Sequence, residues 1–314
     1  MHKHLLPYTL FIIIHNMDRI EVAAYAKVNF ILDMVGKRAD GYHELESIMQ
    51  AIELHDDVYA EWEDDPKASG FKIFLDPGHK DLPADDKNLA FRAALKMKEA
   101  FRPNARGRLN VKIAKRIPLA AGLAGGSADG AAVCTALGRF WNISVEDWLP
   151  VSAALGADVP FCAWAQNGRP AALARGTGTV LTAVEPLNCK LLLVNPGYPV
   201  STKEVYSAFD SSPKGIALAA KPHSEGRCAA WTAAKTINEK LQFMNNDLQP
   251  VTLALRPQLA EIFSQLQNLQ PAPLAVQLSG SGPTVFAVYP PDAEPPEGHP
   301  SYKSLTPPIP AGIR

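Results

Sequence analysis

The sequence predicts a mixed α+β fold, on three observations. Strand-like and helical runs are mixed along the chain, without the regular alternation of a βαβ protein. The length of 314 residues suits one large or two ordinary domains, and an apolar content of 47% is ample for their cores. A glycine-rich stretch near the middle joins a strand-like run to a helical one. Together these features are typical of a globular protein with a ligand-binding loop.

The individual elements follow from the spacing of apolar residues. Short apolar or alternating runs predict strands, which we place at 20–32, 58–62, 71–75, 109–117, 190–194, 275–278 and 284–289. Apolar residues at helical spacing predict helices, which we place at 88–101, 128–141, 233–243 and 250–266. No internal repeat is evident, so a repeat architecture is not expected.

Charge and cysteine content narrow the classes of function. Lys plus Arg total 31 and Asp plus Glu total 32, so no overall field favours nucleic acid or an anionic membrane. The four cysteines are widely spaced, and neither they nor the eight histidines show metal-ligand spacing. We therefore expect a protein of the reducing cytoplasm without a zinc site or disulfides. A small basic cluster, Lys112, Lys115 and Arg116, is interpreted as the solvated face of a strand, with phosphate attraction as the alternative.

Both ends of the chain are expected to lie outside the fold. Residues 1–16 contain an apolar run at 5–14 that lacks a small-residue cleavage site and is too short to span a bilayer. We interpret them as an extension before the folded part. Residues 290–314 contain eight prolines and are interpreted as a proline-rich tail.

The glycine-rich stretch from Pro118 to Asp129 has the features of a phosphate-binding loop. Gly122, Gly125 and Gly126 have no Cβ, so the backbone can take unusual dihedrals and approach a ligand closely. The helix that follows directs unpaired N–H groups and its positive dipole end at the loop, which favours an anion. A simple tight turn is the alternative. The spacing matches neither a Walker loop nor a dinucleotide fingerprint.

This loop resembles the phosphate loop of the GHMP kinases, a superfamily of small-molecule kinases. Two more segments, 24–32 and 278–286, resemble that superfamily and occur in the expected order. The run from Gly36 to Leu45 contains Arg-Ala-Asp-Gly-Tyr-His and resembles the 4-diphosphocytidyl-2-C-methyl-D-erythritol kinases. Segments 155–161 and 194–197 resemble the same family. The resemblance extends from about residue 20 to about residue 289.

The resemblance implies a two-domain GHMP kinase fold with the active site in the interdomain cleft. The expected domains are 17–185, which binds ATP, and 186–289. The implied reaction is transfer of the ATP γ-phosphoryl group to the 2-hydroxyl of 4-diphosphocytidyl-2-C-methyl-D-erythritol, a step of the non-mevalonate (MEP) isoprenoid precursor pathway. Mg²⁺ is the implied cofactor. Neither nucleic acid nor a membrane is an expected partner. Two alternatives stay open: another GHMP kinase of homoserine or mevalonate type, and a catalytically silent nucleotide-binding homologue.

By the same resemblance, Asp158 is the catalytic base and Lys27 its partner. The residues themselves agree with such roles. Asp158 has mostly apolar neighbours in sequence, and Lys27 interrupts an apolar strand-like run, where an unpaired ammonium is costly. A helix-cap or turn aspartate and a lysine that snorkels from a sheet edge are the alternatives.

The resemblance also assigns two binding sites. ATP is expected to bind to Pro118, Leu119, Ala120, Ala121, Gly122, Leu123, Ala124, Gly125, Gly126, Ser127 and Ala128. The acceptor is expected to bind to Asn29, Tyr42, His43, Thr202 and Tyr206. For Tyr42 and His43 the alternative is an exposed turn, and for Tyr206 a core position. Ala128 replaces a serine of many relatives, whereas Ala121 and Ala124 replace glycines of some, which requires negative φ at both. Metal ligands and oligomeric state are not indicated.

Overall fold

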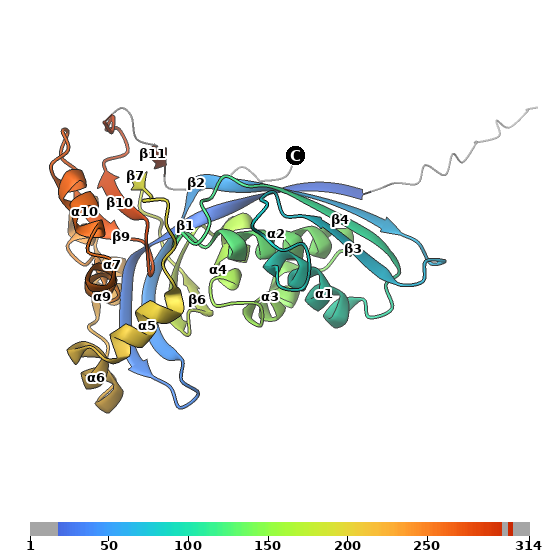
Figure 1. Cartoon of the computed structure of the whole chain (residues 1–314), viewed down its shortest axis with the longest axis horizontal. Coiled ribbons are helices and arrows are strands. Elements are labelled where there is room, and N and C mark those ends of the chain that lie inside the picture. Colours follow the sequence, from blue (N-terminus) through green and yellow to red (C-terminus); the bar gives the residue numbers. More distant parts are fainter. Residues whose placement is uncertain (1–17, 297–300, 304–314) are drawn as a thin grey trace, which may run out of the picture.

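The computed structural model describes residues 18–296 and 301–303, which form two sheets and the helices packed on them (Figure 1). The seven-stranded sheet has the order β3-β4-β2-β1-β8, with β5 paired to β2 and β6 to β5. Its strands are β1 (Asp18–Lys37), β2 (His43–Asp64), β3 (Phe71–Asp76), β4 (Gly107–Ala114), β5 (Ala171–Gly176), β6 (Val180–Ala183) and β8 (Asn245–Asn246). The four-stranded sheet has the order β11-β7-β10-β9. Its strands are β7 (Lys190–Val194), β9 (Ala275–Leu278), β10 (Val285–Tyr289) and β11 (Ser301–Lys303).

A long antiparallel hairpin of β1 and β2 runs through the molecule and joins its two parts (Figure 1). The predicted strands at 20–32 and 58–62 cover only portions of it. The register shifts between Tyr25 and Lys27, between Asn29 and Ile31, and again near Met34. Such bulges bend a strand and re-aim its side chains. The first two bulges lie inside the predicted strand at 20–32, and the third lies beyond its end.

One face of the large sheet is covered by α1 (Leu89–Phe101), α2 (Gly125–Phe140), α3 (Val145–Ala153) and α4 (Val159–Gln166). The core between the layers includes Val58, Met97, Leu109 and Leu137, all of them buried. Helix α2 is rich in Ala and Gly and is buried over most of its length. Small side chains allow this close approach, which fixes the helix that follows the glycine loop.

Six further helices follow in the described part of the chain: α5 (Thr202–Asp210), α6 (Pro213–Ala220), α7 (Arg227–Ala233), α8 (Ile237–Leu241), α9 (Gln249–Leu255) and α10 (Leu259–Gln267). Helix α10 packs on the second sheet, whereas α5 and α6 pack on the β1–β2 hairpin (Figure 1). Two predicted helices, 233–243 and 250–266, are wrong as single elements. Thr236 caps α8 in a reciprocal capping box with Glu239 and so separates it from α7. Pro257 follows Arg256, whose φ of −135° ends α9.

The predicted domain boundary after residue 185 falls between β6 and β7, which belong to different sheets. The chain later returns to the first sheet, because β8 pairs in parallel with β1. The prediction that residues 290–314 lie outside the fold is wrong for 301–303, which pair as β11 with β7. The extension at residues 1–16 lies outside the described residues. Within the described part, no helix is long and apolar enough to cross a membrane.

Candidate active site

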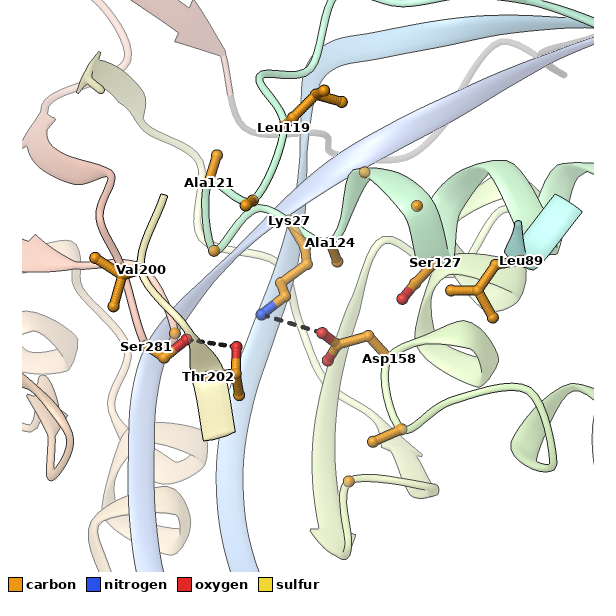
Figure 2. Close-up of a pocket in the computed structure, with 18 of the residues that line it drawn as sticks. Lys27, Leu89, Leu119, Ala121, Ala124, Ser127, Asp158, Val200, Thr202 and Ser281 are labelled. Carbon is orange, nitrogen blue, oxygen red and sulfur yellow. Dashed lines mark hydrogen bonds and ion pairs between the residues drawn. The ribbon is translucent and has the colours of Figure 1, made fainter. Parts of the chain in front are cut away.

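A cavity of about 620 Å³ opens where β1, the glycine loop and the first turns of α4 and α5 meet. Figure 2 shows its lining residues, drawn from segments far apart in the sequence. Lys27 and Asp158 face each other across the cavity, and the loop with Leu119, Ala121 and Ala124 lies beside them. The cavity brings most of the predicted site residues together.

Lys27 is held by the bulged part of β1. Its backbone N–H donates to the carbonyl of Leu123 at 3.1 Å, which ties the strand to the glycine loop. Its ammonium lies 2.7 Å from Asn29 Oδ1, and Asn29 in turn donates to Ser47 Oγ at 2.9 Å. Lys27 is only 4% exposed, so the snorkelling alternative is wrong. Asn29 lies on the same side of the strand as Lys27, as a two-residue period requires.

Asp158 occupies the N-cap position of α4, but its side chain makes no cap hydrogen bond. One carboxylate oxygen, Oδ2, lies 3.6 Å from Lys27 Nζ. The Asp158 side chain is about one-third exposed to the cavity (34%), whereas that of Lys27 is buried. The distance is that of an ion pair rather than a tight hydrogen bond. A carboxylate in this position is accessible to a ligand and still paired with a buried cation.

The glycine loop adopts a strained conformation before α2. Gly122 has a positive φ of +74°. Two non-glycine residues of the loop also have positive φ, Ala120 at +49° and Ala124 at +60°. The requirement of negative φ at Ala124 is therefore not met. A Cβ at Gly122 would lie 2.3 Å from the carbonyl oxygen of Ser279, so only glycine fits there. Most of the loop lines the cavity; Leu123 and Ala128 are buried and do not. A serine at position 128 would therefore have its hydroxyl attached at a buried position.

The Ser279–Gly282 turn packs directly on the glycine loop. Ser279 Oγ donates to the Gly122 carbonyl at 3.0 Å. Ser281 Oγ and Thr202 Oγ1 lie 2.9 Å apart, which links this turn to the start of α5 (Figure 2). Three motifs that are distant in sequence therefore form one wall of the cavity.

Only some of the residues predicted to bind the acceptor line the cavity. Asn29, Thr202 and Tyr206 line the cavity, whereas Tyr42 and His43 are not among its lining residues. Tyr42 is 65% exposed on the β1–β2 turn. His43 contacts Tyr206, a lining residue, with 5.1 Å between ring centroids, and so lies next to the cavity wall.

Sequence reasoning missed a buried charge cluster beneath the loop. Lys115 Nζ bridges Asp56 Oδ2 at 2.5 Å and Asp129 Oδ2 at 2.7 Å. The Lys115 side chain is 7% exposed, so the prediction of a solvated strand face is wrong for this residue. Burial raises the pKa of Asp129 to about 7, although Lys115 acts in the opposite direction. A lysine directly after the alternating strand, next to the loop, was the available signal.

A second missed segment closes the cavity near the start of α1. Its lining residues are Leu82, Pro83, Lys87, Asn88 and Leu89. The Asn88 side chain caps α1 by accepting from the N–H of Ala90. Nothing in the sequence pattern of this loop distinguished it from other polar connections.

The geometry suits transfer of a phosphoryl group. A helix N-terminus and a glycine loop form an anion site, and the buried ammonium of Lys27 lies beside it. A partly exposed carboxylate in the position of Asp158 can accept a proton from a hydroxyl nucleophile. The fold and this arrangement define a kinase of the GHMP class.

Comparison with known proteins agrees. The family model for the GHMP kinases N terminal domain matches residues 88–166, and that for the GHMP kinases C terminal domain matches 232–298. A 4-diphosphocytidyl-2-C-methyl-D-erythritol kinase of Thermoanaerobacter pseudethanolicus is 38% identical and covers 87% of this chain and 88% of its own. The enzyme of that name from Lachnoclostridium phytofermentans is 36% identical, with 87% and 89% covered. The chain belongs to the family of the 4-diphosphocytidyl-2-C-methyl-D-erythritol kinases, which confirms the resemblance seen in the motifs.

Solved structures support the same fold. A crystal structure of 4-(cytidine 5'-diphospho)-2C-methyl-D-erythritol kinase matches with a TM-score of 0.67 and 29% identity, covering 91% of this chain and 99% of that chain. A homoserine kinase from Cytophaga hutchinsonii also matches with a TM-score of 0.67, at 18% identity and with 93% and 96% covered. The second match shows the fold alone. The predicted α+β GHMP kinase fold is confirmed.

Proposed function

We propose that this protein transfers the γ-phosphoryl group of ATP to the 2-hydroxyl of 4-diphosphocytidyl-2-C-methyl-D-erythritol, a step of the MEP route to isoprenoid precursors. The observation that carries the chemistry is the contact of Lys27 with Asp158 at 3.6 Å beside the glycine loop. The family supports the choice of substrate. The GHMP kinase fold supports ATP as the phosphoryl donor.

In the proposed reaction the acceptor hydroxyl attacks the γ-phosphorus. A new O–P bond forms, the bond to the bridging oxygen of ADP breaks, and the hydroxyl proton passes to Asp158. Lys27 stabilises the attacking oxygen and orients the carboxylate. Because Lys27 is itself held by Asn29, its ammonium is fixed before substrate binds. Phosphoryl transfer needs little more than such positioning and charge stabilisation.

The glycine loop and the N-terminus of α2 would hold the phosphates through backbone N–H groups. We include Mg²⁺ in the proposal as the cation that binds together with ATP. Within the described residues, no cluster of three or more metal-ligating side chains occurs. That suits Mg²⁺, which usually binds through one or two protein oxygens together with substrate phosphates. Ser127 would supply such an oxygen in the cavity. When bound, the ion would neutralise phosphate charge.

The acceptor would lie along the wall formed by β1 and α5. Asn29 and Thr202 would contact its polyol, and Tyr206 its base. His43, which contacts the Tyr206 ring, would read the edge of the base, and the exposed Tyr42 beside it would cover the base from solvent.

The test is ADP release by purified protein with Mg-ATP and separate acceptors: the cytidyl-methylerythritol compound, homoserine and mevalonate. We expect activity with the first alone. Asp158→Asn should lower turnover by about two to four orders of magnitude, the usual effect of losing a proton acceptor, with little change in KM for ATP. The same substitution at Asp65, in the connection between β2 and β3, should have no effect. Wild-type turnover in Asp158→Asn would remove this carboxylate from the mechanism.

A further inference from the structure

His43, a residue of the candidate base-binding site, belongs to a chain of polar contacts with Asp210 and Lys37. His43 Nε2 lies 2.7 Å from Asp210 Oδ1, and the other oxygen of the same carboxylate accepts from Lys37 Nζ at 2.7 Å. His43 is the first residue of β2, Lys37 is the last residue of β1, and Asp210 is the last residue of α5. The three groups therefore connect the tip of the long hairpin to the helix that carries Thr202 and Tyr206.

The imidazole of His43 is held in place by contacts on several sides. Its side chain is only 9% exposed. The ring packs against Tyr206 at 5.1 Å and against the edge of Phe209 at 6.0 Å. Tyr206 and Asp210 are four residues apart on α5, so they lie on one face of the helix and meet the same ring. The ring has little freedom to turn or to exchange its two nitrogens.

The contact with Asp210 fixes which nitrogen carries the proton. An ionised carboxylate only accepts hydrogen bonds, so Nε2 must donate. Partial burial acts against ionisation, but hydrogen bonds from Lys37 and His43 outweigh it and lower the pKa of Asp210. Lys37 bonds the other carboxylate oxygen, Oδ2, so Oδ1 is available to accept from His43. The second nitrogen, Nδ1, then has a free lone pair, and no hydrogen bond within the described part of the chain engages it.

We propose that Asp210, oriented by Lys37, is a positioning residue that holds His43 as an Nδ1 acceptor, so that the site selects an exocyclic amino group. This proposal rests on the proposed function. Cytosine carries an amino group at C4, whereas uracil has a carbonyl there. An Nδ1 acceptor would bond the first and oppose the second, and an unpaired buried polar group is a strong basis for discrimination. Asp210 and Lys37 would thereby set the preference of the kinase for a cytidyl over a uridyl acceptor.

Asp210 contacts both Lys37 and His43, so substitutions at 37 and 210 can test the proposal directly. In Asp210→Asn, the amide oxygen should turn to the ammonium of Lys37, because an amide NH₂ facing an ammonium would set donor against donor. The NH₂ would then face His43 and force the ring proton from Nε2 to Nδ1. In the double variant Lys37→Ala/Asp210→Asn the amide is free to rotate, and its oxygen can again accept from Nε2. Lys37→Ala alone keeps the carboxylate and should keep the tautomer.

The tautomer is read by ¹⁵N NMR of histidine-labelled protein, with the His43 signal identified by its loss in His43→Gln. We expect the proton on Nε2 in wild type and Lys37→Ala, on Nδ1 in Asp210→Asn, and on Nε2 again in the double variant. Kinetics supply the second readout: the ratio of kcat/KM for the cytidyl acceptor to that for its uridyl analogue. The ratio should fall about tenfold or more in Asp210→Asn and recover in the double variant, with KM for ATP unchanged.

Glu204→Gln is the matched control, since it makes the same change on α5 but disturbs only the contact with Arg256. It should leave both readouts as in wild type. A wild-type ring protonated on Nδ1, or on both nitrogens, would overturn the proposal, as would an unaltered cytidyl preference in Asp210→Asn. If wild type does not phosphorylate the cytidyl acceptor, the proposed function fails instead, and the NMR result identifies that case separately.

Discussion

At the scale of single residues, the buried group of Lys115, Asp56 and Asp129 is the most unusual feature near the phosphate loop. Asp56 Oδ1 also accepts from the backbone N–H of Ile117 at 2.8 Å, so this carboxylate shapes the start of the loop. Asp129 Oδ1 is buried without a hydrogen-bond partner. Burial is the largest cause of the raised pKa of Asp129, and the neighbouring carboxylate of Asp56 raises it further.

This arrangement predicts a pH dependence of stability. The pKa of Asp129 is about 7 in the folded protein and about 3.9 in an unfolded chain. Between these values the folded state binds more protons, so stability falls as pH rises from about 4 through 7. Asp129→Asn should remove this part of the slope. Urea unfolding at pH 5 and pH 8 should show a difference that is smaller in the variant by roughly 2 kcal/mol.

Asp65→Asn, the same change at a position in the β2–β3 connection, is the reference and should keep the wild-type slope. Equal slopes in wild type and Asp129→Asn would show that Asp129 is ionised in the folded protein throughout this range.

At the scale of elements, the glycine loop and α2 act as one unit. The loop must turn sharply to begin α2 at Gly125, and it does so with left-handed dihedrals at Ala120, Gly122 and Ala124. An L-residue in this region costs about 1–2 kcal/mol. The surrounding contacts, including the bond from Lys27 N–H to Leu123 O, hold the loop in place despite that cost.

The strain predicts that Ala124→Gly stabilises the protein, a result opposite to the usual effect of glycine. Relief of the left-handed conformation outweighs the extra freedom of the unfolded chain, so we expect a gain of about 0.5–1 kcal/mol and a Tm higher by a few degrees. Ala121→Gly is the contrast: Ala121 has no positive φ and is buried. It should lose about 1 kcal/mol. Calorimetry of the two variants measures both, and a lower Tm in Ala124→Gly would contradict the argument.

At the scale of the whole molecule, β1 is the structural link between the two parts. Asp247, directly after β8, accepts from the backbone N–H of Met34 on β1 at 2.8 Å. It also accepts from Asn245 and from Lys214 of α6, each at 2.8 Å. One buried carboxylate thus joins the end of β1 to β8 and to α6, and keeps α6 against the hairpin.

Removing this carboxylate should loosen the second part against the first. Asp247→Ala leaves the N–H of Met34 without its acceptor in a buried site, and a loss of roughly 2–4 kcal/mol is expected. Asp247→Asn retains an oxygen for that N–H and should lose markedly less. Chemical unfolding gives the energies, and hydrogen exchange should show faster exchange in α5 and α6 than in α1. Equal losses in the two variants would mean that charge, rather than the hydrogen bond to Met34, provides the link.

Much of the fold was predictable where pattern and local chemistry agree. The helix near 128–141 and the strands at 190–194 and 275–278 occur as the apolar spacing indicates, because their neighbours do not override local preference. The long hairpin was only partly predicted, since β1 and β2 extend beyond the apolar runs at 20–32 and 58–62. The prediction at 250–266 merged α9 and α10 because apolar spacing continues across Pro257, whereas the prediction at 233–243 began before the Thr236 cap of α8.

The sequence by itself determined the family and located the glycine loop, because local motifs carry that information in contiguous residues. It also predicted Lys27 and Asp158 as the catalytic pair. Only the tertiary structure decided that Lys27 lies within 3.6 Å of Asp158, that Lys115 is buried between two carboxylates, and that Asp210 reaches His43. These contacts join residues separated by tens to more than a hundred positions. Their distances depend on how bulges and packed helices orient each side chain, which no local pattern encodes.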